Sequence, residues 1–170
     1  MFSLNGLADI GFKGFYKVED LTDIRTRDNI TNLPGIYVVV GESIGLPKFL
    51  SNNPGGRHKR KDPSVSIKDL QKKWVDESSV LYIGKANNLR QRIGELIRFS
   101  QGEPIGHWGG RYLWQVAGSK QFLIAWLAKP GKDPHEVETE YLNYFEDKYR
   151  MLPFANLQKG RKNNKTSEVC

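Results

Sequence analysis

Two short apolar segments, far apart in the chain, each carry a tyrosine beside an isoleucine and a glycine. They are Gly35-Ile36-Tyr37 and Tyr82-Ile83-Gly84. Residues 36–40, which follow Pro34, are mostly β-branched. This run predicts a strand with both faces largely buried. Residues 80–83 predict a second strand. Strands of this kind need helices on their faces, so the chain has to fold as a sheet covered by helices.

The segments around these strands alternate between helical and strand-like patterns. Apolar residues at helical spacing, with capping residues before them, predict three helices. The first helix covers residues 66–75. The second runs from a cap at Asn87 or Asn88 to about residue 99, and the third from a cap at Asp133 to about residue 149. Residues 122–128 predict a third strand.

Two segments remain open. Residues 11–18 fit either a short strand or an extended arm, because their glycines weaken a strand prediction, and residues 109–116 fit neither pattern. The fold class predicted is α/β (an α+β layer), with a small antiparallel or mixed sheet flanked by helices. Residues 1–157 are expected to form one domain, with a basic insertion at about 41–78. Residues 158–170 are expected to be a disordered basic tail.

The chain is strongly basic, with a net charge of +7 and an isoelectric point near 9.5. Such an excess is typical of proteins that bind nucleic acid, and DNA is the predicted partner. One cluster in the insertion is Arg57, Lys59, Arg60 and Lys61, and a second in the tail includes Lys159, Arg161, Lys162 and Lys165. Both clusters fit phosphate contacts, but solvated loops are the alternative, and for the tail the better one.

Several classes of protein are excluded by the sequence. No apolar run is long enough to span a membrane. The amino terminus lacks the basic and apolar regions of a signal peptide, and the single cysteine, Cys170, excludes internal disulfides and cysteine zinc sites. A cytoplasmic protein without membrane partners is expected.

The two tyrosines suit phosphodiester chemistry if their strands are adjacent. Hydrolysis of a phosphodiester needs an activated water and cations for the phosphate oxygens. A tyrosine is a poor base at its free pKa near 10, so it needs a cationic neighbour. Lys85 and Arg92 are the candidates, and Arg90 is the alternative to Arg92 for holding the phosphate. Alternatively, Tyr37 and Tyr82 are ordinary aromatic residues of the core, and the arginine is an ordinary surface residue of its helix.

A carboxylate for a metal ion can be found by helical phase. In the helix from residue 134, Glu138 falls near the middle of the apolar side, whereas Glu140 lies about 160° away from it on the polar side. A buried glutamate is costly unless it is paired, protonated or bound to metal. Glu138 is therefore the predicted metal ligand, with a buried ion pair or a shifted helix register as the alternative.

These residues, in this order, resemble the GIY-YIG nuclease family. The family's tyrosines, arginine, glutamate and asparagine are matched by Tyr37, Tyr82, Arg92, Glu138 and Asn156. The resemblance covers residues 33–157. It implies a three-stranded antiparallel sheet, one Mg²⁺ (or Mn²⁺) on the glutamate, and a tyrosine as general base toward water.

The chain departs from the family pattern in three places. The insertion separates the two tripeptides much further than usual. Many members carry a histidine or tyrosine where this chain has Leu96, and His107 is a candidate substitute as proton acceptor. The interval from glutamate to asparagine is longer than usual, which leaves Glu140 as a rival to Glu138.

The predicted function is a metal-dependent DNA endonuclease. Tyr37 is the favoured base, Tyr82 orients it or the water, and Arg92 clamps the phosphate with help from Lys85. Asn156 positions backbone or substrate. His107 and Arg111, in the segment at 106–115, join the basic insertion as candidate DNA contacts. Restriction, repair and mobile-element defence are all left open as its role. The alternatives are a nucleic-acid-binding module of the same fold without cleavage and a structural subunit of a larger complex. A homodimer is also left open.

Overall fold

The computed structural model describes residues 2–41 and 45–158. These ranges contain one four-stranded sheet in the order β1-β4-β2-β3, and every neighbouring pair runs antiparallel. The strands are β1 (Lys13–Lys17), β2 (Gly35–Val40), β3 (Val80–Ala86) and β4 (Leu123–Ala128). The predicted α/β layer is confirmed, and its sheet is antiparallel rather than mixed.

The expected number of three strands is wrong, because β1 adds a fourth beside β4. Gly14 (φ 98°) and Phe15 (φ 58°) both have left-handed backbone, and the register shifts between Gly14 and Tyr16. Such a bulge interrupts the alternation of side chains that identifies a strand in a sequence. Gly14 also leaves room for the Trp126 ring, which an added Cβ would approach to 2.2 Å.

The three predicted helices are present, and the two for which caps were predicted begin at Asn88 and Asp133. The Asn88 Oδ1 accepts a hydrogen bond from Gln91 N (3.0 Å), and the Asp133 Oδ1 accepts one from His135 N (2.9 Å). The helices are α1 (Leu4–Asp9), α2 (Ile24–Arg27), α3 (Ile67–Lys73), α4 (Leu89–Ser100) and α5 (Pro134–Tyr149). Four 3-10 turns are η1 (Asp20–Thr22), η2 (His58–Arg60), η3 (Trp108–Gln115) and η4 (Ser119–Gln121), of which η3 occupies the segment that fitted no pattern.

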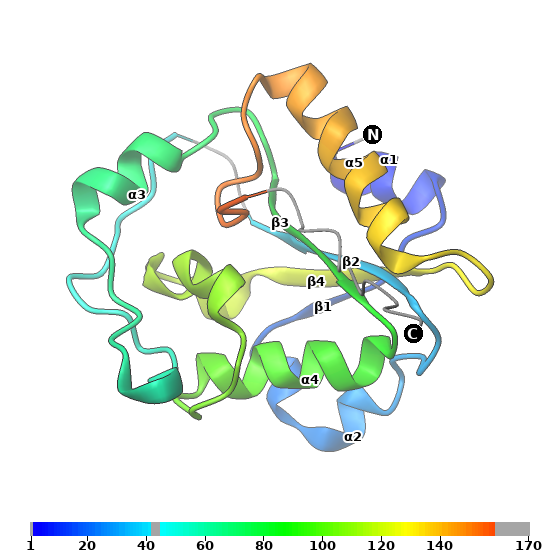
Figure 1. Ribbon diagram of the computed structural model, residues 1–170, viewed down its shortest axis with the longest axis horizontal. Helices are drawn as coiled ribbons and strands as arrows, with labels where there is room; N and C mark the ends of the chain where they lie inside the picture. Colours follow the sequence, from blue (N-terminus) through cyan, green and yellow to red (C-terminus); the bar gives the residue numbers. More distant parts are fainter. Residues whose placement is uncertain (1, 42–44, 159–170) are drawn as a thin grey trace, which may run out of the picture.

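The two faces of the sheet pack against different helices (Figure 1). Tyr37 and Val39 of β2 join a core that contains the buried side of α4, whereas Ile36, Val38 and Val40 join a core with α1 and α5. All six residues of β2 are buried, as predicted. Alternate side chains of β2 therefore face α4 on one side of the sheet and α5 on the other.

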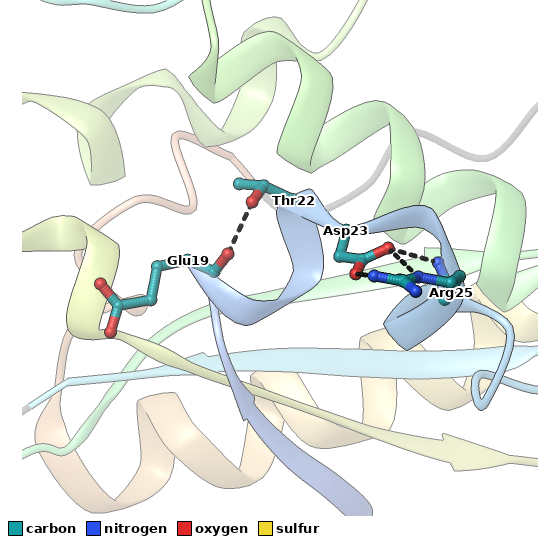
Figure 2. A network of polar contacts seen from close by, with 4 residues as sticks. All are labelled: Glu19, Thr22, Asp23 and Arg25. Atoms are coloured by element: carbon teal, nitrogen blue, oxygen red, sulfur yellow. Dashed lines mark hydrogen bonds and ion pairs between the residues drawn. The ribbon is translucent and has the colours of Figure 1, made fainter.

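The connection from β1 to β2 contains a local polar network, shown in Figure 2. Asp23 caps α2 by accepting a hydrogen bond from Arg25 N (2.9 Å), and its carboxylate pairs with the Arg25 Nη2 (2.8 Å). Thr22 Oγ1 donates to the Glu19 carbonyl oxygen (2.7 Å). These exposed bonds shape the turn but add little to stability.

The insertion at 41–78 is attached to the core by two buried amide side chains. Gln115 Nε2 donates to the carbonyls of Leu50 (3.0 Å) and Val65 (2.7 Å), and its Oε1 accepts from Val65 N (2.8 Å). Asn53 Nδ2 donates to the Arg111 carbonyl (2.7 Å). Fully bonded buried amides hold backbone firmly, so the described part of the insertion is fixed against η3.

The carboxy-terminal segment lies along strand β3. Asn156 Oδ1 accepts from Ile83 N (2.9 Å) and Asn156 Nδ2 donates to the Ile83 carbonyl (2.8 Å). Ala155 N donates to the Leu81 carbonyl (2.8 Å). Residues 159–170, which are most of the predicted tail, lie outside the described residues. Within the described ranges, no helix has the length and apolar character to cross a membrane.

Candidate active site

Two phenols and an imidazole meet on the α4 face of the sheet. Tyr37 pairs with Gly84, and Tyr82 pairs with Val39, so the two tyrosines are diagonal neighbours on β2 and β3. Their ring centroids are 5.9 Å apart, and the His107 ring lies 6.5 Å from Tyr37 and 6.2 Å from Tyr82. The Tyr37 Oη and the His107 Nε2 are hydrogen-bonded at 2.9 Å. All three side chains are buried.

The glycine of the second tripeptide makes room for the tyrosine of the first. A Cβ at Gly84 would lie 2.5 Å from the Tyr37 Cζ and 2.6 Å from its Oη. The backbone of Gly84 is ordinary strand, so the requirement for glycine here is one of volume. This contact gives the glycine of the second tripeptide a structural reason in the tyrosine of the first.

We expect Gly84→Ala to destabilise the fold by about 1–3 kcal/mol, because the Tyr37 ring is fully buried and has nowhere to move. Urea or thermal unfolding measures the loss. Gly94→Ala is the matched control, since a Cβ at this α4 position meets nothing within 4 Å. Alanine also favours a helix more than glycine does, so the control should be stabilised. Equal stabilities would contradict the close contact.

The phenols are electrostatically linked to residues on both helices. Burial raises the pKa of Tyr37 well above its ordinary value, and the neighbouring Tyr82 raises it further. Burial likewise raises the pKa of Tyr82. Arg92 on α4 lowers both pKa values and Glu138 on α5 raises both. Both phenols are therefore protonated at neutral pH, within the field of one cation and one carboxylate.

Arg92 and Arg90 have different surroundings on α4. The Arg92 side chain is partly exposed, and its Nη1 lies 2.6 Å from Glu95 Oε2. Burial lowers the pKa of Arg92, but the phenols and Glu95 outweigh it and the net shift is upward. Arg90 Nε instead donates to the Ile30 carbonyl (2.7 Å) and its Nη2 to the Asp28 carbonyl (2.8 Å). Arg90 thus joins α4 to the segment before β2, and Arg92 faces the phenols.

A lysine, a histidine and a glutamate form a second cluster beside β3. Lys85 Nζ lies 3.0 Å from Glu138 Oε2 and 2.7 Å from His135 Nδ1. His135 Nδ1 and Glu138 Oε2, both on α5, are 3.8 Å apart. The Glu138 Oε2 receives no well-aligned hydrogen bond although it is buried, so the Lys85 ammonium balances its charge as an ion pair.

The rival glutamate lies elsewhere. Glu138 is 7% exposed, whereas Glu140 is exposed and accepts a hydrogen bond from Tyr144 Oη (3.1 Å). Helical phase had predicted this division. Asn156 uses its whole amide on the Ile83 backbone. Of the two roles predicted for it, positioning backbone is the one that its contacts support.

His107 is a buried neutral base. Burial and, to a lesser extent, the nearby Arg92 lower its pKa to about 3. Its Nδ1 is buried without a hydrogen-bond partner among the described residues. The side chain had been a candidate DNA contact as well as a candidate proton acceptor. Its full burial and its bond to Tyr37 connect it to the phenols and not to the surface.

The burial of His107 makes stability depend on pH. The unfolded chain binds a proton at this residue below about pH 6.5 and the folded chain does not, so acid favours unfolding. Between pH 6.5 and 4.5 we expect this group to lower the free energy of unfolding by up to about 1.4 kcal/mol per pH unit. Urea unfolding of His107→Gln should show a shallower pH slope than that of the wild type. Parallel slopes in the two proteins would contradict the burial.

The basic residues of the insertion form an exposed turn. Arg57, Lys59, Arg60 and Lys61 are exposed around η2, and Arg57 pairs with Asp62 (3.1 Å). This turn approaches the segment that leads to His107, because a Cβ at Gly106 would lie 3.6 Å from the His58 ring. We call these four residues the basic turn. Arg111, on η3, is only half-buried, and its guanidinium stacks on the ring of Trp108 (4.8 Å).

Sequence reasoning missed two partners in the site. His135 is three residues before Glu138 on α5, and Glu95 is three residues after Arg92 on α4. Residues at this spacing lie on one face of a helix, which was the available signal. The role of Gly84 was also missed, because a close approach between strands leaves no trace in a single sequence.

Within residues 2–41 and 45–158, no group of three or more His, Cys, Asp and Glu side chains is arranged to hold a metal ion. A cation here would thus have to share protein ligands with water and phosphate oxygens, as Mg²⁺ commonly does. In comparisons with known proteins, no family model, no curated protein and no solved structure matches the chain.

Proposed function

We propose that the protein is a metal-dependent DNA endonuclease that hydrolyses phosphodiester bonds. The observation that carries this proposal is that Arg92 on α4 and Glu138 on α5 both act on the neighbouring phenols of Tyr37 and Tyr82, whose pKa values they shift from opposite faces of the sheet. Each of these side chains has an ordinary structural explanation alone. Their electrostatic coupling, between residues far apart in the chain, is what favours a common site.

Two cations are available for the phosphate. Arg92 has a partly exposed side chain whose charge acts on both phenols, and the Lys85 side chain is a third exposed (34%). A guanidinium binds two phosphate oxygens at once, so Arg92 would hold the scissile phosphate. Once the Lys85 ammonium leaves Glu138, it would neutralise the negative charge that develops on the scissile phosphate.

The carboxylate of Glu138 fits a divalent cation. It is buried, its Oε2 lacks a well-aligned hydrogen bond, and a cation already balances it. A bound Mg²⁺ or Mn²⁺ would supply charge stabilisation at the phosphate and the leaving oxygen. Glu138 would be its carboxylate ligand, and Asn156 would keep β3 in place beneath it through Ile83.

Tyr37 is the proposed general base, acting together with His107. In the free protein the phenol is protonated, so it can take a proton from water only as it passes its own to the His107 Nε2. Burial and Arg92 hold the pKa of His107 at about 3 and oppose this transfer. An anionic phosphodiester beside Arg92 would offset that cation and favour the imidazolium.

One observation favours the second candidate, a nucleic-acid-binding module without cleavage. Tyr37 is fully buried, and the raised pKa values of both phenols leave neither as a ready base at neutral pH. Such a module would keep the fold and the basic turn and lack turnover.

The two candidates are separated by incubating the purified protein with supercoiled plasmid and Mg²⁺ or Mn²⁺, with EDTA as the control. Nicked or linear product that needs the metal is the expected result. DNA retardation without product would favour the binding module. Neither product nor retardation would contradict both candidates.

The basic turn provides a separate test of DNA binding. Replacing Arg57, Lys59, Arg60 and Lys61 by glutamine should weaken duplex binding and flatten its salt dependence, with the log–log slope falling by up to about 0.9 per lost phosphate contact. Fluorescence anisotropy over a salt series measures the slope. A variant in which Lys13, Lys120 and Lys132, all exposed and outside the insertion, become glutamine is the control. An unchanged slope in the first variant would make the turn a solvated loop.

A further inference from the structure

The cluster of Lys85, His135 and Glu138 has the geometry of a cation site in which a lysine stands in for the cation. The ammonium lies 2.7 Å from His135 Nδ1 and 3.0 Å from Glu138 Oε2, so one positive centre contacts both atoms. An ammonium has only hydrogens to donate, and therefore Nδ1 must present its lone pair. An imidazole nitrogen and a carboxylate oxygen thus point their lone pairs at one place.

The two acceptors belong to the same rigid element. His135 and Glu138 are three residues apart on α5, which places them on one side of the helix with Nδ1 and Oε2 3.8 Å apart. The N-terminal cap at Asp133 fixes the turn that carries His135. The pair is therefore held together whether or not Lys85 is present.

The three side chains differ in their access to water. Glu138 is buried, with its side chain 9% exposed, and His135 is 18% exposed, whereas Lys85 is 34% exposed. A buried carboxylate needs a cation close to it. Lys85 is the one of the three that can turn outward into water, and its long stem allows the ammonium to leave while its carbons stay packed.

We infer that His135 and Glu138 are the two protein ligands of a divalent first-row transition cation such as Mn²⁺, which displaces the Lys85 ammonium. This inference rests on the proposed function in one respect, the assignment of Glu138 as metal ligand. It adds the second ligand and the preferred class of metal. An imidazole nitrogen is a better ligand for a transition cation than for Mg²⁺, which prefers oxygen and keeps its waters. Displacement also frees Lys85 for a phosphate.

The test measures metal binding to the whole protein without DNA. Mn²⁺ affinity is followed by loss of the electron paramagnetic resonance signal of the free ion, and Mg²⁺ affinity by competition. His135→Ala should weaken Mn²⁺ binding by about tenfold or more and change Mg²⁺ binding by less than about threefold. Lys85→Met should tighten binding of both ions by about tenfold, because it removes the competing cation. His58→Ala, which removes a histidine outside the Lys85, His135 and Glu138 cluster, should match the wild type.

Other results either overturn the inference or separate it from the proposed function. Unchanged Mn²⁺ affinity in folded His135→Ala, weaker binding in folded Lys85→Met, or no binding to the wild type at millimolar Mn²⁺ overturns the inference. Circular dichroism and thermal melts establish that each variant is folded, and Mn²⁺ should raise the melting temperature of Lys85→Met more than that of the wild type. Mn²⁺ binding through His135 without plasmid cleavage would contradict the proposed function and leave the inference standing. Plasmid cleavage by the wild type, together with unaltered Mn²⁺ binding in His135→Ala, would contradict the inference and leave the proposed function standing.

Discussion

Glu138→Gln is expected to abolish metal-dependent cleavage while the protein stays folded. Glutamine keeps the shape of the side chain but removes the charge that a divalent cation requires. Glu138 is buried on α5, and its charge raises the pKa of both phenols. A plasmid assay with Mg²⁺ and with Mn²⁺ measures the loss, which should exceed three orders of magnitude if the metal carries the charge stabilisation.

Stability provides the internal check on this variant. Removing the carboxylate leaves the Lys85 ammonium without its ion-pair partner, but Lys85 is a third exposed and can turn to water. The loss in the free energy of unfolding should therefore stay near 1 kcal/mol without metal. Glu140→Gln is the matched control, because Glu140 is exposed on the same helix and contacts only Tyr144 among the bonds described. Loss of cleavage in Glu140→Gln with full activity in Glu138→Gln would move the metal site to the other side of α5.

Arg92→Ala should reduce cleavage by orders of magnitude and leave duplex affinity within about tenfold, because a phosphate clamp matters more in the transition state than in the ground state. Arg92 is also the cation that lowers the pKa of both phenols. The residual activity should therefore shift to higher pH. Single-turnover rates from pH 6 to 10, together with affinities in EDTA, measure both effects.

Arg90→Ala separates the clamp from a general effect of losing an arginine on α4. Arg90 is bonded to the carbonyls of Ile30 and Asp28, so its loss should lower stability and leave the rate at saturating substrate nearly unchanged. If Arg92→Ala cuts at the normal rate and Arg90→Ala does not, the phosphate clamp has been assigned to the wrong arginine.

The parts of the fold that follow local rules were predictable. Asn88 and Asp133 start the helices that they were expected to cap, and β2 is buried on both faces as its composition indicated. The phase of α5 buries Glu138 and exposes Glu140 because helical periodicity leaves little freedom over a few residues. Each of these depends on neighbours within one or two turns of the chain.

What depends on distant partners was not predictable. Strand β1 carries a bulge at Gly14 and Phe15, and it exists because β4 offers it an edge. Lys85 was expected to serve the phosphate, but its pairing with His135 and Glu138 depends on how α5 docks on β3. The burial of His107 likewise depends on η3 and the insertion folding over the sheet.

The amide of Asn156 has a consequence for the behaviour of the protein at high concentration. An uncovered edge strand offers its backbone groups to a strand from another molecule and so promotes aggregation. Asn156 occupies both backbone groups of Ile83, and Ala155 N donates to the Leu81 carbonyl, so these groups of β3 are closed to such pairing. The opposite edge, β1, is short and bulged, and it begins and ends with the exposed Lys13 and Lys17. Both edges of the sheet therefore oppose growth into fibrils, one through the backbone bonds of residues 155 and 156 and the other through an irregular, charged strand.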